Sequence, residues 1–208
     1  PSLLDAPLTK LGEEEAEHAR QRMLELHARG FPEPEEVLVS PLQRALQTAN
    51  LIFPDCNDIH VREDLIERQT GRACDHRQKA ELLARRGSFQ RFSMVQLRTS
   101  SLMKRMLKEL EDVQLQEIAE TGCEGEYKKI EERIEEKPML QKRTKRLGRF
   151  LMNSDHRVFV AVTHKAFLRE LERGTFGIQD APEFSNCEVR VYKLKCENYD
   201  LTSVERIA

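Results

Sequence analysis

The chain has 208 residues, of which 39% are hydrophobic and 34% charged, so it can bury the core of one domain of ordinary size. Its formal net charge of −2 gives no overall attraction to nucleic acid or to a membrane surface, and an anionic partner would have to bind in a local pocket. The longest strand-like apolar run, residues 158–162, is far too short to span a bilayer. We therefore expect neither nucleic acid nor a membrane as a partner.

The five cysteines are odd in number and contain no Cys-x-x-Cys pair. This pattern argues against a zinc site and against a disulfide scaffold. We expect reduced thiols in a cytoplasmic protein, with no metal and no cofactor. The oligomeric state is left open by the sequence.

The first predicted element is a helix with clear signals at both ends. Thr9 can cap it, and Gly30 stands where a C-terminal cap belongs. Its apolar stripe consists of Ala16, Ala19, Met23 and Leu26.

A short buried strand is predicted at residues 37–39, directly before a second helix. Ser40 as the cap and Pro41 at the first helical position predict where that helix starts, and Pro54 predicts its end. The order helix, strand, tight turn, helix is typical of an α/β fold.

The residue pattern changes over residues 84–151, where apolar residues recur at helical spacing among many charged residues. Within it, Ile130 and Ile134 mark a segment that Pro138 should end, and a further helix follows with Leu140, Leu147 and Leu151. Strands return at residues 158–163 and 187–194, the second with alternating apolar and polar positions. We predict one domain, 1–208, with a helical insertion at 84–151.

Arg44 is the first candidate for chemistry. It lies in the first turn of a helix that follows a strand, where the helix dipole favours anions and a guanidinium can grip a phosphate with two hydrogen bonds. The alternative, an ordinary solvated arginine, is favoured by spacing alone.

Two further candidates follow predicted strands or loops. His164 ends the strand at 158–163, where side chains of an open α/β sheet reach a ligand crevice; a histidine satisfied by a nearby carbonyl is an equal alternative. Glu67 precedes Gly71 on a loop and could act as a proton donor if its pKa is raised. Glu63 competes for that role, and most glutamates in so charged a chain are merely solvated.

A basic cluster lies on one predicted helix, and we interpret it as a solvated face balanced by glutamates at 131–136. Attraction of an anionic substrate or partner is the alternative. Aromatic residues do not alternate with these cations, which disfavours nucleic-acid binding. The cluster consists of Lys142, Arg143, Lys145, Arg146 and Arg149.

Taken together, these stretches resemble the histidine phosphatase superfamily, which includes the phosphoglycerate mutases. The most specific piece is Ser-Pro-Leu-Gln-Arg-Ala-Leu-Gln-Thr-Ala, and the others are a Leu-Thr-x-x-Gly segment, an acid-bearing loop, a Val-Thr-His segment and a following strand. In chain order the matching segments are residues 5–12, 40–49, 65–71, 162–169 and 184–189. The resemblance implies a three-layer α/β/α phosphoglycerate mutase-like sheet, here without its first strand.

The resemblance also implies a mechanism without a metal. A nucleophilic histidine in an Arg-His-Gly segment takes the phosphoryl group as a phosphohistidine, Arg44 binds the transferring phosphate, His164 stabilises the developing charge and Glu67 protonates the leaving oxygen. The expected partner is a phosphorylated small molecule or a phosphoprotein. Lys165 departs from the family, which often has a small residue there.

The Arg-His-Gly segment belongs upstream of Leu8, and the residues before Leu8 include neither histidine nor arginine. The remaining histidines considered for the role, His18, His27, His60 and His76, lie in the wrong sequence contexts. Two interpretations follow. Either this chain is a truncated form of a longer, working phosphatase, or the full-length protein is a pseudo-enzyme that lacks the segment. The start of the sequence at Pro1 favours truncation. In both cases we expect no turnover from residues 1–208.

Three functions follow from these interpretations, in order of preference. The first is an inactive piece of a phosphatase, the second a phospho-ligand-binding module without catalysis, and the third an interaction module using the helical region near 94–151. The sequence does not separate a mutase from a phosphatase, although we prefer hydrolysis.

Overall fold

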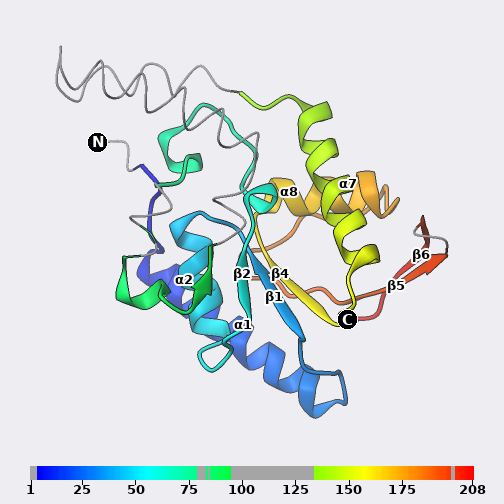
Figure 1. Cartoon of the computed structure of the whole chain (residues 1–208), viewed down its shortest axis with the longest axis horizontal. Helices are drawn as coiled ribbons and strands as arrows, with labels where there is room; N and C mark the ends of the chain where they lie inside the picture. The colour runs from blue at the N-terminus through cyan, green and yellow to red at the C-terminus, as the bar shows by residue number, and fades with distance from the viewer. Residues whose placement is uncertain (1–3, 79–82, 84, 95–133, 198–199) are drawn as a thin grey trace.

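The computed structural model describes residues 4–78, 83, 85–94, 134–197 and 200–208. Within these ranges the chain alternates helices with the strands of a parallel sheet and ends in a β-hairpin (Figure 1). The longer elements are α1 (Lys10–Ala28), β1 (Glu36–Val39), α2 (Gln43–Ile52), β2 (Ile59–Val61), β3 (Phe92–Ser93), α7 (Lys137–Asn153), β4 (Phe159–Val162), α8 (Lys165–Glu170), β5 (Tyr192–Glu197) and β6 (Asp200–Arg206). Short helical turns are η1 (Glu63–Leu65), η2 (Ala73–Asp75), η3 (Gly87–Phe89) and η4 (Leu171–Thr175).

Four strands form the central sheet in the order β3-β2-β1-β4, and every pairing in it is parallel. Val37 of β1 lies opposite Ile59 of β2 on one side and opposite Val160 of β4 on the other. The hairpin β5–β6 is a separate antiparallel sheet. Because β1, β2 and β4 run in the same direction, their carboxyl ends lie at the same edge of the central sheet.

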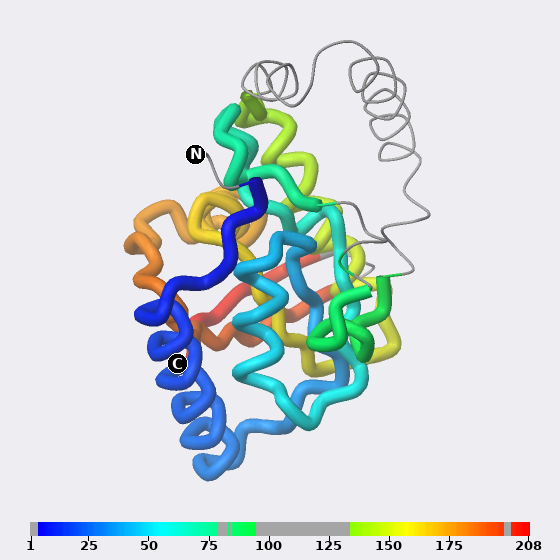
Figure 2. Tube along the Cα trace, turned by 90° about the vertical axis from the view of Figure 1, so that its left-hand side faces the viewer, coloured from blue at the N-terminus to red at the C-terminus, as the bar shows by residue number. Residues whose placement is uncertain are grey.

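Helices cover both faces of this sheet. Val37 and Val39 of β1 pack with Leu46 and Ala49 of α2, whereas Leu38 points the other way into a second apolar cluster. That second cluster is built with α7, α8 and the turns beside them, and consists of Leu38, Leu65, Leu140, Leu147, Phe167 and Leu171. In Figure 2 the helices α1 and α2 lie on one side of the strands, with α7 beyond them. A mixed α/β fold with a parallel central sheet is thus confirmed.

Strand β4 ends the sheet among the described residues, because β1 is the only strand there that pairs with it. All four residues of β1 are buried, but all four of β4 are only partly buried although they are Phe, Val, Ala and Val. Central strands of parallel sheets are normally covered on both sides. The outer edge of β4 is therefore open to a further strand in the described part of the chain.

Several local predictions are confirmed. Thr9 caps α1, its side chain accepting a hydrogen bond from the Gly12 N–H at 3.1 Å. Gly30 has a φ of +89° directly after the helix, which glycine adopts without steric cost. The strands predicted at 37–39 and 158–163 form as β1 and β4, and α2 ends before Pro54.

Two predictions for helical segments were wrong. The second helix starts at Gln43 and not at Pro41, because Leu42 is extended and the Ser40 hydroxyl accepts from the Leu42 N–H instead of capping a helix. Ile134, which was predicted in a helical segment, forms an isolated bridge with Thr70. The next predicted helix, with Leu140, Leu147 and Leu151, is confirmed as α7, and Pro138 lies in its first turn, where its missing N–H costs nothing.

The last strand was also placed too early. Residues 187–194 were predicted as a strand, but β5 begins at Tyr192 and Cys187 has a φ of +50°, which no strand residue adopts. Alternation of apolar and polar residues predicted the strand and missed the turn before it. The division into a domain and an insertion at 84–151 stays a prediction, since residues 95–133 lie outside the described ones. Within the described part of that range, β3 joins the sheet and α7 packs against it.

Candidate functional site

The three sequence candidates follow three neighbouring parallel strands. Arg44 comes after β1 at the start of α2, Glu67 follows β2 and η1, and His164 directly follows β4. Because the carboxyl ends of parallel strands meet at one edge, these side chains belong to one region of the molecule. The charge of Arg44 affects the pKa of both Glu67 and His164, which places the three groups in one electrostatic site.

Arg44 is held by the η2 segment. Its Nη1 donates to the Cys74 carbonyl at 2.6 Å, and its Nη2 lies 3.4 Å from Oδ1 of Asp75. The Arg44 side chain is 25% exposed and that of Asp75 10%. Arg44 is thus neither a free surface arginine nor an unoccupied anion receptor, because an anion would have to compete with the Asp75 carboxylate.

The N-terminus of α2 is occupied by a carboxylate of the protein itself. Asp5 is buried, has a φ of +51°, and accepts from the Gln43 N–H at 2.7 Å and from the Gln78 N–H at 3.0 Å. Burial raises the pKa of Asp5, while these two backbone bonds lower it. The helix dipole on which the Arg44 prediction relied is therefore satisfied by Asp5, and sequence reasoning missed this role.

His164 is the N-terminal cap residue of α8 and is buried. Its Nε2 lies 2.7 Å from the hydroxyl oxygen of Ser40, a buried residue that follows β1. Burial above all, and then the positive charges of Arg44 and Arg143, hold the pKa of His164 well below its ordinary value of 6.5. The imidazole is therefore neutral at pH 7 in the absence of an anion. The contact with Ser40 was not predicted.

Glu67 is half-buried, and its Oε1 accepts from the Arg68 N–H at 2.8 Å. Burial raises the pKa of Glu67, outweighing the lowering by the Arg68 N–H and by the charge of Arg44. A carboxyl group with a raised pKa has the protonation behaviour of a general acid. The rival acid Glu63 is paired with Arg77, whose Nε lies 2.9 Å from Glu63 Oε2.

The predicted solvated basic face is correct for four of its five members and wrong for Arg143. Lys142, Lys145, Arg146 and Arg149 are exposed, whereas Arg143 reaches the loop that carries Glu67. Periodicity carried a weak signal, because Arg143 is three residues after the buried Leu140 and four before the buried Leu147. It therefore borders the buried stripe of α7.

The site combines two arginines, a neutral histidine and a carboxyl group that is protonated more readily than usual. Such a group of side chains can bind a phosphate anion and supply a proton to a departing oxygen. In the part of the chain that the structure describes, no cluster of three or more histidine, cysteine or acidic side chains is arranged to hold a metal ion. Among the described helices, none has both the length and the apolarity needed to cross a bilayer.

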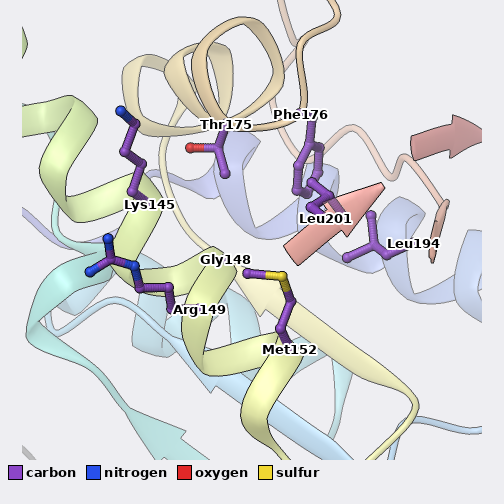
Figure 3. A pocket seen from close by; sticks show the side chains of 8 residues that line it. All are labelled: Lys145, Gly148, Arg149, Met152, Thr175, Phe176, Leu194 and Leu201. Atoms are coloured by element: carbon purple, nitrogen blue, oxygen red, sulfur yellow. The ribbon is translucent and has the colours of Figure 1, made fainter. Parts of the chain in front are cut away.

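A surface pocket of about 210 Å³ lies elsewhere, between α7, the end of η4 and the hairpin β5–β6 (Figure 3). It has Lys145 and Arg149 at one side and Met152, Phe176 and two leucines at the other. Arg44, Glu67 and His164 do not line it, so it is not the candidate site.

Comparisons with known proteins agree with the fold. The family model described as "Histidine phosphatase superfamily (branch 1)" matches residues 2–114, more than half of the chain. Among solved structures, a mycobacterial glucosyl-3-phosphoglycerate phosphatase superposes with a TM-score of 0.58 at 14% identity, over 98% of this chain and 88% of that one. An Escherichia coli protein provisionally assigned as an alpha-ribazole-5'-P phosphatase gives 0.53 at 17% identity, over 96% and 84%. No curated protein matched the sequence.

Proposed function

The chain belongs to the histidine phosphatase superfamily, and we propose that its site serves the hydrolysis of phosphate monoesters through a phosphohistidine. In this proposal Arg44 binds the phosphoryl group, His164 stabilises the charge that develops on it, and Glu67 protonates the leaving oxygen. Each role asks for positioning and charge, and none requires a metal or cofactor.

The observation that carries the proposal is the convergence of three residues distant in sequence at the carboxyl ends of β1, β2 and β4. Arg44 influences the pKa of both Glu67 and His164, and His164 contacts Ser40, four residues before Arg44. A structural role alone would not require a general acid and a neutral histidine beside the same guanidinium.

The pKa directions fit the proposed roles. A phosphate dianion beside His164 would offset the two nearby cations, raise the pKa of the imidazole and favour its protonated, charge-stabilising form. Burial keeps Glu67 protonated to a higher pH than a free glutamate, as a proton donor needs. Binding and proton transfer are thus assigned to different side chains of one site.

The nucleophile of this mechanism is not found within these 208 residues, because no Arg-His-Gly occurs in the sequence. We propose that the strand carrying it pairs with the open edge of β4, which would cover the partly buried residues of that strand. Residues 1–208 alone should then bind phosphate without turning it over. A pseudo-enzyme that only binds phospho-ligands would behave in the same way, and the natural coding sequence upstream of Pro1 separates the two.

The substrate class is proposed to be a phosphorylated small molecule. The two similar solved structures are described as phosphatases of glucosyl-3-phosphoglycerate and of alpha-ribazole-5'-P, both small phosphate esters. A phosphoprotein substrate is the alternative. Four described cysteines are free thiols, which supports the proposed cytoplasmic location.

The test is a calorimetric titration of purified 1–208 with inorganic phosphate, alongside a turnover assay with p-nitrophenyl phosphate. We expect saturable binding, no product, and loss of binding in Arg44→Ala but not in Arg146→Ala, an exposed arginine. Absence of phosphate binding by the unchanged chain would contradict the site. Substantial turnover that disappears in His164→Ala would contradict the assignment of the nucleophile to a separate strand.

A further inference from the structure

Arg143 differs from the other cations of α7 in what its guanidinium contacts. Its Nη1 donates to the carbonyls of Asp64 at 3.0 Å and Ile66 at 2.7 Å, and its Nη2 lies 3.5 Å from the carbonyl of Glu67. These carbonyls belong to the segment that ends at the proposed general acid. One side chain of α7 thus ties down a loop 76 to 79 residues away in sequence.

Glu135 fixes the guanidinium from the other side. Arg143 Nε donates to Glu135 Oε1 at 2.7 Å and Nη2 to Oε2 at 2.5 Å, a two-pronged pair between side chains only 14% and 7% exposed. The backbone of Glu135 binds the same loop, because its N–H donates to the Gln69 carbonyl at 2.8 Å. The loop of Glu67 is therefore held by Arg143 and by the residue that orients Arg143.

The donors of Arg143 are used up by these contacts. A guanidinium has five N–H donors, and here Nε, Nη1 and Nη2 together serve one carboxylate and three carbonyls. Arg143 therefore has no N–H donor left for a phosphate. Arg143 also lies over the ring of Phe167, three residues after His164, with the guanidinium carbon 5.4 Å from the ring centre.

We infer that Arg143, oriented by Glu135, is a positioning residue that sets the placement of Glu67. The inference rests on the proposed function and adds a control element to the same site. The hydrogen bonds of Arg143 can be tested separately from its charge, because it is the hydrogen bonds that hold the loop. A lysine at position 143 keeps the positive charge but lacks the planar set of N–H donors of the guanidinium, and a glutamine keeps neither.

The experiment uses the whole chain with Arg143→Lys and Arg143→Gln, and Arg146→Lys as the matched control on an exposed position of the same helix. Carbon- and nitrogen-detected NMR titrations follow the pKa of Glu67 and of His164, and calorimetry follows inorganic phosphate. In Arg143→Lys we expect the pKa of Glu67 to fall toward its ordinary value, since the loosened loop admits water, while His164 keeps its lowered pKa. Phosphate should still bind, because Arg143 contacts loop carbonyls and Glu135, while Arg44 and His164 are unchanged.

In Arg143→Gln the pKa of His164 should also rise, because one of its two neighbouring cations is gone. Glu135→Gln, which keeps the shape of the partner, should shift Glu67 in the same direction as Arg143→Lys and serves if either Arg143 variant fails to fold. An unchanged pKa of Glu67 in Arg143→Lys and in Glu135→Gln, even with a lower melting temperature, would reduce Arg143 to a structural residue. If the unchanged chain binds no phosphate the proposed function fails, but the response of the Glu67 pKa still decides the role of Arg143.

Discussion

Replacing Asp75 by asparagine should strengthen phosphate binding, because the Asp75 carboxylate competes with an anion for Arg44. In Asp75→Asn the amide oxygen can still accept from the Thr70 hydroxyl, which lies 2.5 Å from Asp75 Oδ2. The amide nitrogen would then face Arg44 and cannot accept from it. Arg44 would retain only its bond to the Cys74 carbonyl, while the backbone of η2 keeps its hydrogen bonds.

The size of the effect follows from the geometry of the pair. Two unit charges 3.4 Å apart attract by about 5 kcal/mol at an effective dielectric constant of ~20. Solvent reaches a quarter of the Arg44 side chain, and measured pairs of such exposure contribute about 1 kcal/mol net. An equal gain in phosphate binding corresponds to a dissociation constant about fivefold lower.

Calorimetry with inorganic phosphate at pH 7 measures this change directly. Asp155→Asn, at an exposed turn, controls for the change in net charge, and the double variant Arg44→Ala/Asp75→Asn should not bind. A dissociation constant that is unchanged or higher in a normally folded Asp75→Asn protein would refute the view that Asp75 occupies the phosphate-binding group.

Two further predictions concern stability. Arg190 and Glu172 form an ion pair between side chains that are only 1% and 2% exposed. Arg190→Met should lower the free energy of unfolding by about 3–5 kcal/mol, because it removes the counter-ion of a buried carboxylate. Urea denaturation measures this change, and a loss under about 1 kcal/mol would contradict the reasoning. The native pKa of His164 lies below its unfolded value, so the unfolded chain binds the extra proton and stability should fall as the pH drops below about 6.5. His164→Gln should lack that part of the slope, at most about 1.4 kcal/mol per pH unit, in urea denaturation at pH 7.5 and 5.5; identical slopes in both proteins would argue against it.

Local signals predicted the local structure well. The cap at Thr9, the glycine at position 30 and the short apolar strand of β1 depend on neighbours within a few residues, and all three are found where the sequence places them. The boundaries failed where a distant residue decided them. The Asp5 carboxylate binds the Gln43 N–H across 38 positions, and the start of α2 lies there and not at the Ser40-Pro41 signal.

The residue types of the site were likewise visible in the sequence. Arg44 and His164 could be placed at a helix start and a strand end by pattern, and the resemblance supplied their roles and that of Glu67. The sequence spacing alone did not favour a functional role over an ordinary structural one for any of these three residues. Membership of the superfamily is the part of the functional interpretation that the comparisons confirm.

The sequence by itself determined the α/β class, the first helix and the strands β1 and β4, because backbone propensity and caps act over a few residues. Only the tertiary structure decided that Asp75 engages Arg44, that Ser40 lies against His164 and that Arg143 holds the loop of Glu67. These contacts join segments that are 31 to 124 positions apart, and they form because parallel strands end at one edge while α7 packs across it. The periodicity of the sequence does not predict such contacts, because they depend on how the layers pack and not on neighbouring residues in the chain.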